Sequence, residues 1–296
     1  MPVSVTTEGS ENTVGNFESA YDAYQSKKRI FNIVVLAIIV LCLVLSLIST
    51  EFDFYTLISG IPRTGDFLSR LVPPITYDEF WLDVLDWYWD IEKWMVNLLN
   101  TLLMAFLSTL LGTILGGGLS FLAAQNLARH YATYWITRRL LEVARTVPDI
   151  VWALIFVITF GVGPMAGVLA IMIHTVGAQG KLFAEVNENI SHHPIEGVRA
   201  SGGNWYQEIR FAVLPQVLPN FMSYTFWRFE LNVRSATIVG FVGAGGIGHD
   251  LFIAIQLLEF SDAGAILLIL VTTIMLIDIA SEKLRHHLVG KEALKR

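Results

Sequence analysis

Long apolar segments separated by shorter polar ones dominate the sequence. The first apolar segment, residues 30–50, contains no Asp, Glu, Lys or Arg. Charge-free segments follow at residues 95–128 and 150–180, and residues 263–277 form the apolar core of a last one. Because about 20 apolar residues are enough to cross a bilayer as a helix, the pattern predicts an all-α, polytopic membrane protein with about six transmembrane helices.

The segment at residues 150–180 is interrupted by G-V-G-P-M-A-G, which predicts a hairpin of two helices that turns at Gly163 and Pro164. Two complete spans need about forty residues, so these helices must extend into flanking sequence or be short. A fifth span is expected to start at Phe211 and to lead into a glycine-rich stretch near the outer surface.

The alternation of apolar and polar segments divides the chain into five parts. We expect an N-terminal tail (1–29), a first transmembrane helix (30–50), an external loop (51–94), a transmembrane core (95–282) and a C-terminal tail (283–296). The N-terminal tail is rich in Ser, Thr, Glu and Asn, which is typical of disorder. In the external loop, the sequence W-L-D-V-L-D-W-Y-W-D-I-E-K-W predicts an amphipathic interfacial helix with an aromatic belt formed by Trp81, Trp87, Trp89 and Trp94.

The positions of Lys and Arg predict the orientation, because cytoplasmic loops carry an excess of them. Lys27, Lys28 and Arg29 adjoin the first span, and a cluster of arginines between residues 129 and 145 follows the second. The external loop holds only Arg63, Arg70 and Lys93 among many acidic residues. The sequence therefore predicts a multi-pass membrane protein with both termini in the cytoplasm.

Composition excludes several functional classes. Hydrophobic residues make up 54% of the chain and charged residues 16%, against about 25% charged in a soluble domain. No basic patch is present for nucleic-acid binding. The single cysteine, Cys42, and the adjacent pairs His192-His193 and His286-His287 lack the spacing of a zinc site, so we expect no bound metal.

Two glycine-containing motifs resemble nucleotide-binding signatures but have the wrong context. Gly243, Gly245 and Gly248 spell G-x-G-x-x-G without a preceding strand or a surrounding βαβ unit. With Gly246, these glycines are expected to allow close helix packing or to form a re-entrant gate loop. Gly180-Lys181 fails as a phosphate-binding loop because Leu182 replaces Ser or Thr. We therefore expect no cofactor on this chain, which is not predicted to be an enzyme.

The polar segment 190–215 is predicted to form an ordered helix–turn–helix in the cytoplasm. Pro194 and the Glu196 carboxylate favour a helix start, and Gly202-Gly203 favours its end. Pro215 is suited to open the next helix, whose first turn does not need the missing N–H. The alternative is an amphipathic loop lying on the lipid headgroups.

Charged residues also occur within a segment apolar enough to span the membrane. A charge at a helix centre costs about 2.5–3.5 kcal/mol, so such residues usually face a protein interior or an aqueous cavity. On a helix, Glu230 and Arg234 can meet, whereas Arg228 points elsewhere. The pair is either structural or, with Arg228, part of a cationic patch for an oxyanion, because guanidinium groups match the oxygens of such an anion. His174 could donate to a passing anion or be a satisfied core histidine.

The spacing of the segment 190–215 resembles the cytoplasmic signature of permeases of ABC importers. That signature reads E-A-A, three residues, G, nine residues, I-x-L-P, and this chain matches it except at Gly197, Val198 and Ala212. The resemblance implies a loop that couples to a separate ATPase. Its expected residues are Glu196, Gly197, Ala200, Gly202, Gly203, Leu214 and Pro215.

The similarity extends over about residues 97–287 and is most specific in R-F-E-L-N-V-R-S-A-T, which resembles permeases of phosphonate importers. It implies the type I ABC importer fold in the bacterial inner membrane and a second copy of the chain. It also implies two cytoplasmic ATPase subunits that carry ATP and Mg²⁺, and a periplasmic substrate-binding protein. The pathway residues expected from this reasoning are Arg228, Glu230, Asn232, Arg234, His174 and Thr175. The expected cargo is phosphonate or a related phosphorus oxyanion, such as phosphite or a phosphate ester. The alternatives are a permease of the same fold for methionine or an osmoprotectant, or an autonomous secondary transporter.

Overall fold

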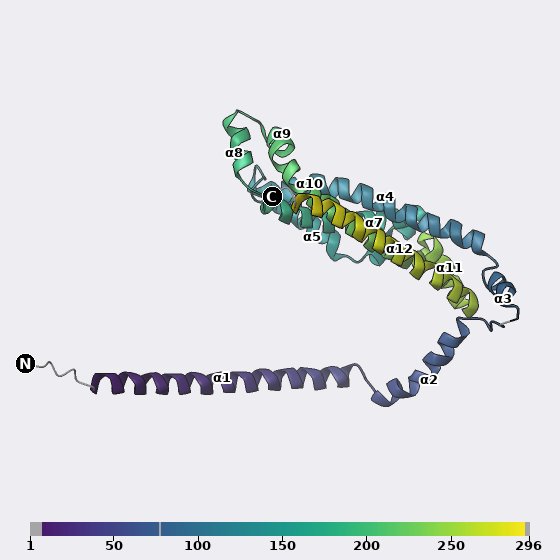
Figure 1. Ribbon diagram of the computed structural model, residues 1–296, viewed down its shortest axis with the longest axis horizontal. Helices are drawn as coiled ribbons and strands as arrows, with labels where there is room; N and C mark the ends of the chain where they lie inside the picture. Colours follow the sequence, from purple (N-terminus) through teal and green to yellow (C-terminus); the bar gives the residue numbers. More distant parts are fainter. Residues whose placement is uncertain (1–7, 77, 294–296) are drawn as a thin grey trace, which may run out of the picture. The chain divides into compact units, whose positions relative to one another are not determined.

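A computed structural model of the protein describes residues 8–76 and 78–293, and all regular secondary structure in these ranges is helical (Figure 1). The predicted all-α class is therefore confirmed for the described part. The chain divides into two compact units, Met1–Asp66 and Phe67–Arg296. The second unit holds all of the predicted site residues.

The first unit consists mainly of the long helix α1 (Glu8–Ser49). Its apolar part, Tyr24–Ser49, is long enough to cross a membrane and confirms the predicted first span. The helix begins at Glu8, so the expectation of a disordered tail is wrong over residues 8–29. The sequence before the span contains Ala, Gln, Lys and Glu, which are good helix formers, and it extends a helix that the apolar span already nucleates.

An additional amphipathic helix, α2 (Phe54–Arg70), follows α1. Its start is capped by Asp53, whose carboxylate accepts hydrogen bonds from the Thr56 hydroxyl at 2.6 Å and from the Tyr55 amide at 2.9 Å. These bonds, led by that of the Thr56 hydroxyl, lower the pKa of Asp53. The sequence predicted an interfacial helix only around the tryptophans of residues 81–94, and α2 was not predicted.

The tryptophan-rich segment forms the short helix α3 (Phe80–Trp87) and the start of α4 (Ile91–Ala123). Trp81 and Trp89 are exposed, as the predicted aromatic belt requires. Trp87 and Trp94 are buried instead, and the indole of Trp87 donates to the Ser261 carbonyl at 2.7 Å. Half of the expected belt is therefore wrong, because these two rings pack against the last helix of the bundle.

Helix α4 lies closely against α7 (Pro164–Glu188) in the second unit. Small residues permit this approach: a Cβ atom on Gly112 would lie 2.6 Å from Cγ2 of Thr175, and one on Gly116 would lie 2.9 Å from the Val176 carbonyl oxygen. Close packing through small residues is the usual way in which helices associate in a membrane.

Two helices, α5 (Tyr131–Thr146) and α6 (Asp149–Phe160), form a pair bent by 87° at Val147 and Pro148. The arginines of this region predicted a loop, but the structure has the helix α5 there. The predicted hairpin is present, since α6 ends at Phe160 and α7 begins at Pro164. The amide of Gly163 in this turn donates to the Gly243 carbonyl at 2.9 Å.

The remaining elements are α8 (His193–Ala200), α9 (Trp205–Gln207), the π turn η1 (Glu208–Val213), α10 (Leu214–Val239), the π turn η2 (Gly240–Ala244), α11 (Ile247–Gln256) and α12 (Phe260–Ala293). Pro215 stands in the first turn of α10, as predicted, where its missing N–H is not needed. The π turn η1 runs into α10 without a break, so this helix start continues the turn before it.

Within the second unit, α8 and α9 lie at one end of the bundle and α3 and α11 at the other, while α12 runs between the two ends (Figure 1). Over the described residues of the whole chain, four helices are long and apolar enough to cross a membrane. The number rises to six when the bent pairs Tyr131–Phe160 and Trp205–Gln256 are each counted as one span. This agrees with the prediction of about six spans.

Candidate functional site

The polar segment after α7 folds as the predicted helix–turn–helix. Pro194 stands in the first turn of α8, and Glu196 is the acidic residue of that turn. The turn after α8 needs glycine at residue 202, where φ is +78°. The amide of Gly203 donates to the Val198 carbonyl at 2.9 Å, which closes the end of α8. The local signals in the sequence therefore determine this element.

A bidentate ion pair fixes α8 against η1. Nε and Nη2 of Arg199 each donate to one carboxylate oxygen of Glu208 at 2.9 Å. The side chain of Glu208 is only 9% exposed, whereas that of Arg199 is 56% exposed. The hydrogen bonds to Glu208 raise the pKa of Arg199. Sequence reasoning missed this pair.

The surface of the α8–η1 region is hollowed and carries exposed aromatic side chains. A groove of about 440 Å³ lies between α8 and η1. Its lining includes Gly197, Gly202, Gly203 and Phe211. Phe211 is 67% exposed and Tyr206 is 70% exposed. Exposed aromatic rings beside a groove are typical of a surface that a protein partner covers.

The connection between α4 and α5 anchors α9 to the bundle. The indole of Trp205 donates to the Leu127 carbonyl at 2.8 Å. The guanidinium carbon of Arg129 lies 5.4 Å from the centre of the Trp205 ring and 5.9 Å from that of Tyr206. Such contacts attract a cation to an aromatic face and join two segments that are distant in the sequence.

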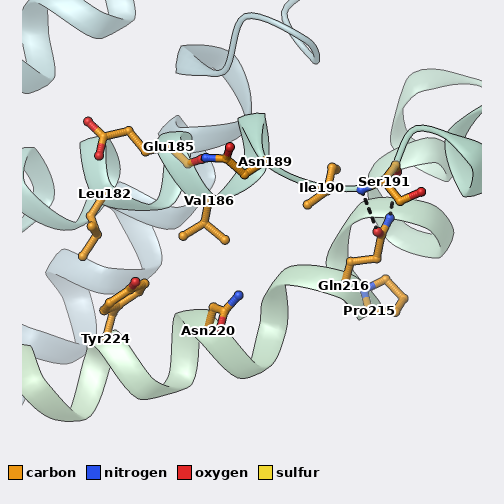
Figure 2. A pocket seen from close by; sticks show the side chains of 10 residues that line it. All are labelled: Leu182, Glu185, Val186, Asn189, Ile190, Ser191, Pro215, Gln216, Asn220 and Tyr224. Carbon is orange, nitrogen blue, oxygen red and sulfur yellow. Dashed lines mark hydrogen bonds between the residues drawn. The ribbon is translucent and has the colours of Figure 1, made fainter. Parts of the chain in front are cut away.

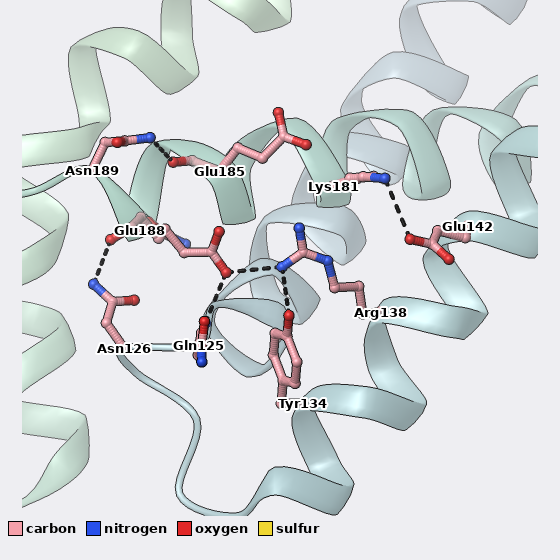
Figure 3. Close-up of polar contacts among 10 residues, drawn as sticks. Gln125, Asn126, Tyr134, Arg138, Glu142, Lys181, Glu185, Glu188 and Asn189 are labelled. Atoms are coloured by element: carbon pink, nitrogen blue, oxygen red, sulfur yellow. Dashed lines mark hydrogen bonds and ion pairs between the residues drawn. The ribbon is translucent and has the colours of Figure 1, made fainter.

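The same connection is tied to the end of α7, as Figure 3 shows. The carboxylate of Glu188 accepts hydrogen bonds from Arg138 and from the Gln125 amide, both at 2.9 Å. Two turns earlier on α7 and one turn later on α5, Lys181 pairs with Glu142 at 3.3 Å. The polar contacts therefore join α4, α5 and α7 at the end of the bundle that carries α8.

A second groove lies between the end of α7 and the start of α10 (Figure 2). It has a volume of about 690 Å³, and its lining combines Glu185, Asn189, Asn220 and Tyr224 with apolar side chains. The Gln216 side chain closes one end of it by accepting from the Ser191 amide at 3.1 Å. The groove opens beside α8 and lies between two candidate membrane spans.

The predicted pathway residues Arg228, Asn232, Thr175 and His174 come together deep in the second unit. The Asn232 amide donates to the hydroxyls of Thr109 at 2.8 Å and Thr175 at 2.9 Å. Nε of Arg228 lies 3.5 Å from the Thr175 hydroxyl. Arg228, Asn232 and the two threonines are buried within the bundle. A protein interior is where a charge inside a membrane span is usually found, because such a charge is costly in lipid.

The predicted ion pair between Glu230 and Arg234 is present on α10. Glu230 is buried, whereas the Arg234 side chain is 46% exposed. Arg228 points elsewhere, as its spacing on the helix predicts, and contacts Thr175 instead. Arg228 and Arg234 therefore do not form one cationic patch in this structure.

The glycine-rich stretch at residues 240–248 forms a break between α10 and α11. Gly243, Gly245 and Gly246 have positive φ values of +97°, +77° and +75°. A Cβ atom on Gly248 would overlap the Thr237 carbonyl oxygen. The stretch thus packs tightly against α10, while a role as a gate stays a prediction.

Sequence reasoning missed Asp149 and Ser235, which lie beside the pathway residues. Ser235 donates to Oδ2 of Asp149 at 2.5 Å, and Nδ1 of His174 lies 2.9 Å from Oδ1. The expectation that His174 is a satisfied core histidine agrees with this contact. Among the described residues, no group of three or more His, Cys, Asp or Glu could hold a metal ion.

Comparison with known proteins identifies related sequences and folds. The family model described as "Binding-protein-dependent transport system inner membrane component" matches residues 116–291. The phosphite transport system permease protein PtxC of Stutzerimonas stutzeri is 34% identical over 79% of this chain and 81% of its own length. The phosphate-import permease protein PhnE of Mycolicibacterium smegmatis is 36% identical over 77% of this chain and 41% of its own length.

The fold is also found in solved structures. A crystal structure of a bacterial ABC transporter that imports the acidic polysaccharide alginate aligns with a TM-score of 0.61. The alignment covers 84% of this chain and 95% of that chain at 13% identity. At this identity, the likeness shows a common fold and nothing more.

Proposed function

The chain belongs to the family of binding-protein-dependent transport system inner membrane components, and we propose that it is the permease of an ATP-driven importer for a phosphorus oxyanion. The observation that carries the substrate class is the 34% identity to a phosphite permease over 79% of the chain. The buried Arg228 supports an anionic cargo, because a guanidinium matches phosphonate and phosphite oxygens.

The partner that we propose for the α8–η1 surface is a separate ATPase in the cytoplasm. The groove between α8 and η1, with Phe211 at its edge, supports this role. With the ATPase at the end that carries α8, we propose that both termini lie in the cytoplasm. A periplasmic binding protein then docks at the end that carries α3 and α11. The ATP and Mg²⁺ of the transport cycle then belong to the ATPase.

The assembly that we propose contains two copies of this chain around one pathway. The exposed side of Arg234 and the groove between α7 and α10 support an arrangement in which a second subunit faces them. Mass determination of the purified complex tests it. A complex that contains two different permeases instead of two copies of this one would contradict the homodimer.

Reconstitution tests the proposed function. Liposomes that hold the chain, its ATPase and its binding protein should take up phosphite, methylphosphonate or phosphate only when ATP is present. The purified chain alone should hydrolyse no ATP. Uptake of methionine or glycine betaine in place of all three phosphorus compounds would refute the substrate class, and uptake by the chain without the ATPase would refute the importer.

A further inference from the structure

The carboxylate of Asp149 occupies a position among hydrogen-bond donors from two other helices. It is the first residue of α6, directly after the bend at Pro148. Ser235 of α10 donates to Oδ2 at 2.5 Å, and Nδ1 of His174 on α7 lies 2.9 Å from Oδ1. The Asp149 side chain is 18% exposed and that of His174 is 21% exposed. The carboxylate is therefore largely removed from solvent.

The acceptors around His174 determine which of its ring nitrogens carries the hydrogen. Nδ1 lies 3.2 Å from the Val147 carbonyl oxygen as well as beside the Asp149 carboxylate. Both neighbours are acceptors, so Nδ1 must carry the hydrogen. The imidazole of α7 thus places its N–H beside Oδ1 of Asp149, whereas Ser235 of α10 donates to Oδ2.

Arg228 supplies the positive charge beside this carboxylate. Its buried guanidinium interacts electrostatically with Asp149, and its Nε lies 3.5 Å from the Thr175 hydroxyl. Asn232 holds that hydroxyl at 2.9 Å. A charge removed from water is costly without a counter-charge. The guanidinium and the carboxylate attract each other through their charges, although no ion pair or hydrogen bond joins them directly.

Two of the donors lie well inside their helices. Arg228 is 14 residues into α10, about 21 Å along the helix at 1.5 Å per residue. His174 is 10 residues into α7, about 15 Å along. Asp149 begins α6 at the bend, and Ser235 lies four residues before the end of α10. Arg228 and His174 therefore lie at a depth of the candidate spans where an anion that crosses the membrane would lose its water.

The donor set is the kind that recognises an oxyanion. It comprises a hydroxyl that donates to the Asp149 carboxylate, an imidazole nitrogen that lies 2.9 Å from it, and a guanidinium that acts on it through its charge. Carboxylate and phosphorus oxyanions share the same preference for charge-assisted hydrogen bonds from such groups. A site with these donors and no internal carboxylate would bind an anion tightly and release it slowly.

We propose that Asp149 is an internal anion that occupies an oxyanion site formed by Arg228, His174 and Ser235, and that the transported oxyanion replaces it there during the cycle. The inference rests on the proposed function. Asp149 adjoins the 87° bend between α5 and α6, so a change in that bend moves the carboxylate relative to the donors on α7 and α10. Competition by the Asp149 carboxylate lowers the affinity of the site for the oxyanion, so that the oxyanion can leave.

Direct binding to the purified chain in lipid nanodiscs tests the proposal. Binding of [³³P]phosphite is measured for the wild-type chain, Asp149→Asn, Asp149→Ser and the double variant Asp149→Asn with Arg228→Gln. Both single variants should bind at least about tenfold more tightly than the wild type, because one charge-assisted hydrogen bond recovered by the ligand corresponds to about 1.5–3 kcal/mol. The double variant should lose that gain. A folded single variant that binds no better than the wild type would overturn the proposal.

A second anion and a charge-retaining variant provide two further tests. Sulfate serves as a second probe: a gain for sulfate without a gain for phosphite would uphold the oxyanion site and reject the phosphorus cargo. Asp149→Glu retains the charge and should therefore fold even where the neutral variants do not. Its longer side chain carries the competing carboxylate further among the donors, so phosphite uptake in the complete transporter should fall. Unchanged uptake in Asp149→Glu would count against the proposal.

Discussion

The ion pair between Arg199 and Glu208 should control how firmly α8 is held against the rest of the protein. Arg199 donates two hydrogen bonds of 2.9 Å to the Glu208 carboxylate. Hydrogen bonds to charged groups contribute about 1.5–3 kcal/mol each, but the Arg199 side chain is 56% exposed and solvent screens it. We therefore expect Arg199→Ala to weaken the docking of α8 by about 1–2 kcal/mol in total.

The loss should be local. A change of 1–2 kcal/mol corresponds to about a 5–30-fold change in an equilibrium, so amide hydrogen exchange in peptides covering α8 should accelerate by that factor. Exchange in α4 and α7 should stay unchanged. The exposed Arg210 provides the matched control, because Arg210→Ala removes the same charge and a similar side chain without breaking this pair.

A double-mutant cycle separates the pair from its surroundings. Arg199→Ala leaves the buried carboxylate of Glu208 without its counter-ion, whereas adding Glu208→Gln removes that unpaired charge. The double variant should therefore lose less than the sum of the single losses, by about 1 kcal/mol. Strict additivity, or an equal effect of Arg210→Ala on α8, would show that the pair does not hold the helix.

Two glycine positions give further expectations, each with a matched control. Gly248→Ala should lower the melting temperature and yield of the purified chain at a cost of about 3 kcal/mol or more, because the new Cβ overlaps the Thr237 carbonyl. Gly118→Ala, on a helix with open space, should instead stabilise by about 0.5–1 kcal/mol, and equal melting temperatures would contradict the packing argument. Gly202→Ala should cost about 1–2 kcal/mol at its φ of +78°, measured by hydrogen exchange in α8. Gly197→Ala should slow that exchange, since the position is helical with nothing near its Cβ, and faster exchange there would reject this reading.

The elements that the sequence predicted correctly depend on signals within a few residues. The start and end of α8 follow from Pro194 and Gly202, and the hairpin between α6 and α7 follows from the Gly163-Pro164 pair. The ion pair of Glu230 and Arg234 follows from their spacing on one helix. Each of these predictions depends only on residues that are close together in the chain, so a single sequence is enough to make it.

The elements that the sequence missed depend on partners far along the chain. Asp149 pairs with His174 and Ser235, which lie 25 and 86 positions away. No local pattern marks Asp149, since an acidic residue at the start of a helix is already explained by the helix dipole. The burial of Trp87 likewise depends on Ser261 in α12, and a tryptophan near an expected interface looks the same in either environment.

The contacts also define a continuous path between the surface at α8 and the cluster around Asp149. Trp205 of α9 donates to the carbonyl of Leu127, and Arg129 in the same connection lies over the Trp205 ring. The connection leads directly into α5, whose far end meets α6 at Asp149. A displacement of α9 therefore either breaks the Trp205–Leu127 hydrogen bond or moves the start of α5. In the second case, the 87° bend at the other end of α5 must adjust or the carboxylate of Asp149 must shift, because the polar contacts to α7 limit how far α5 can slide.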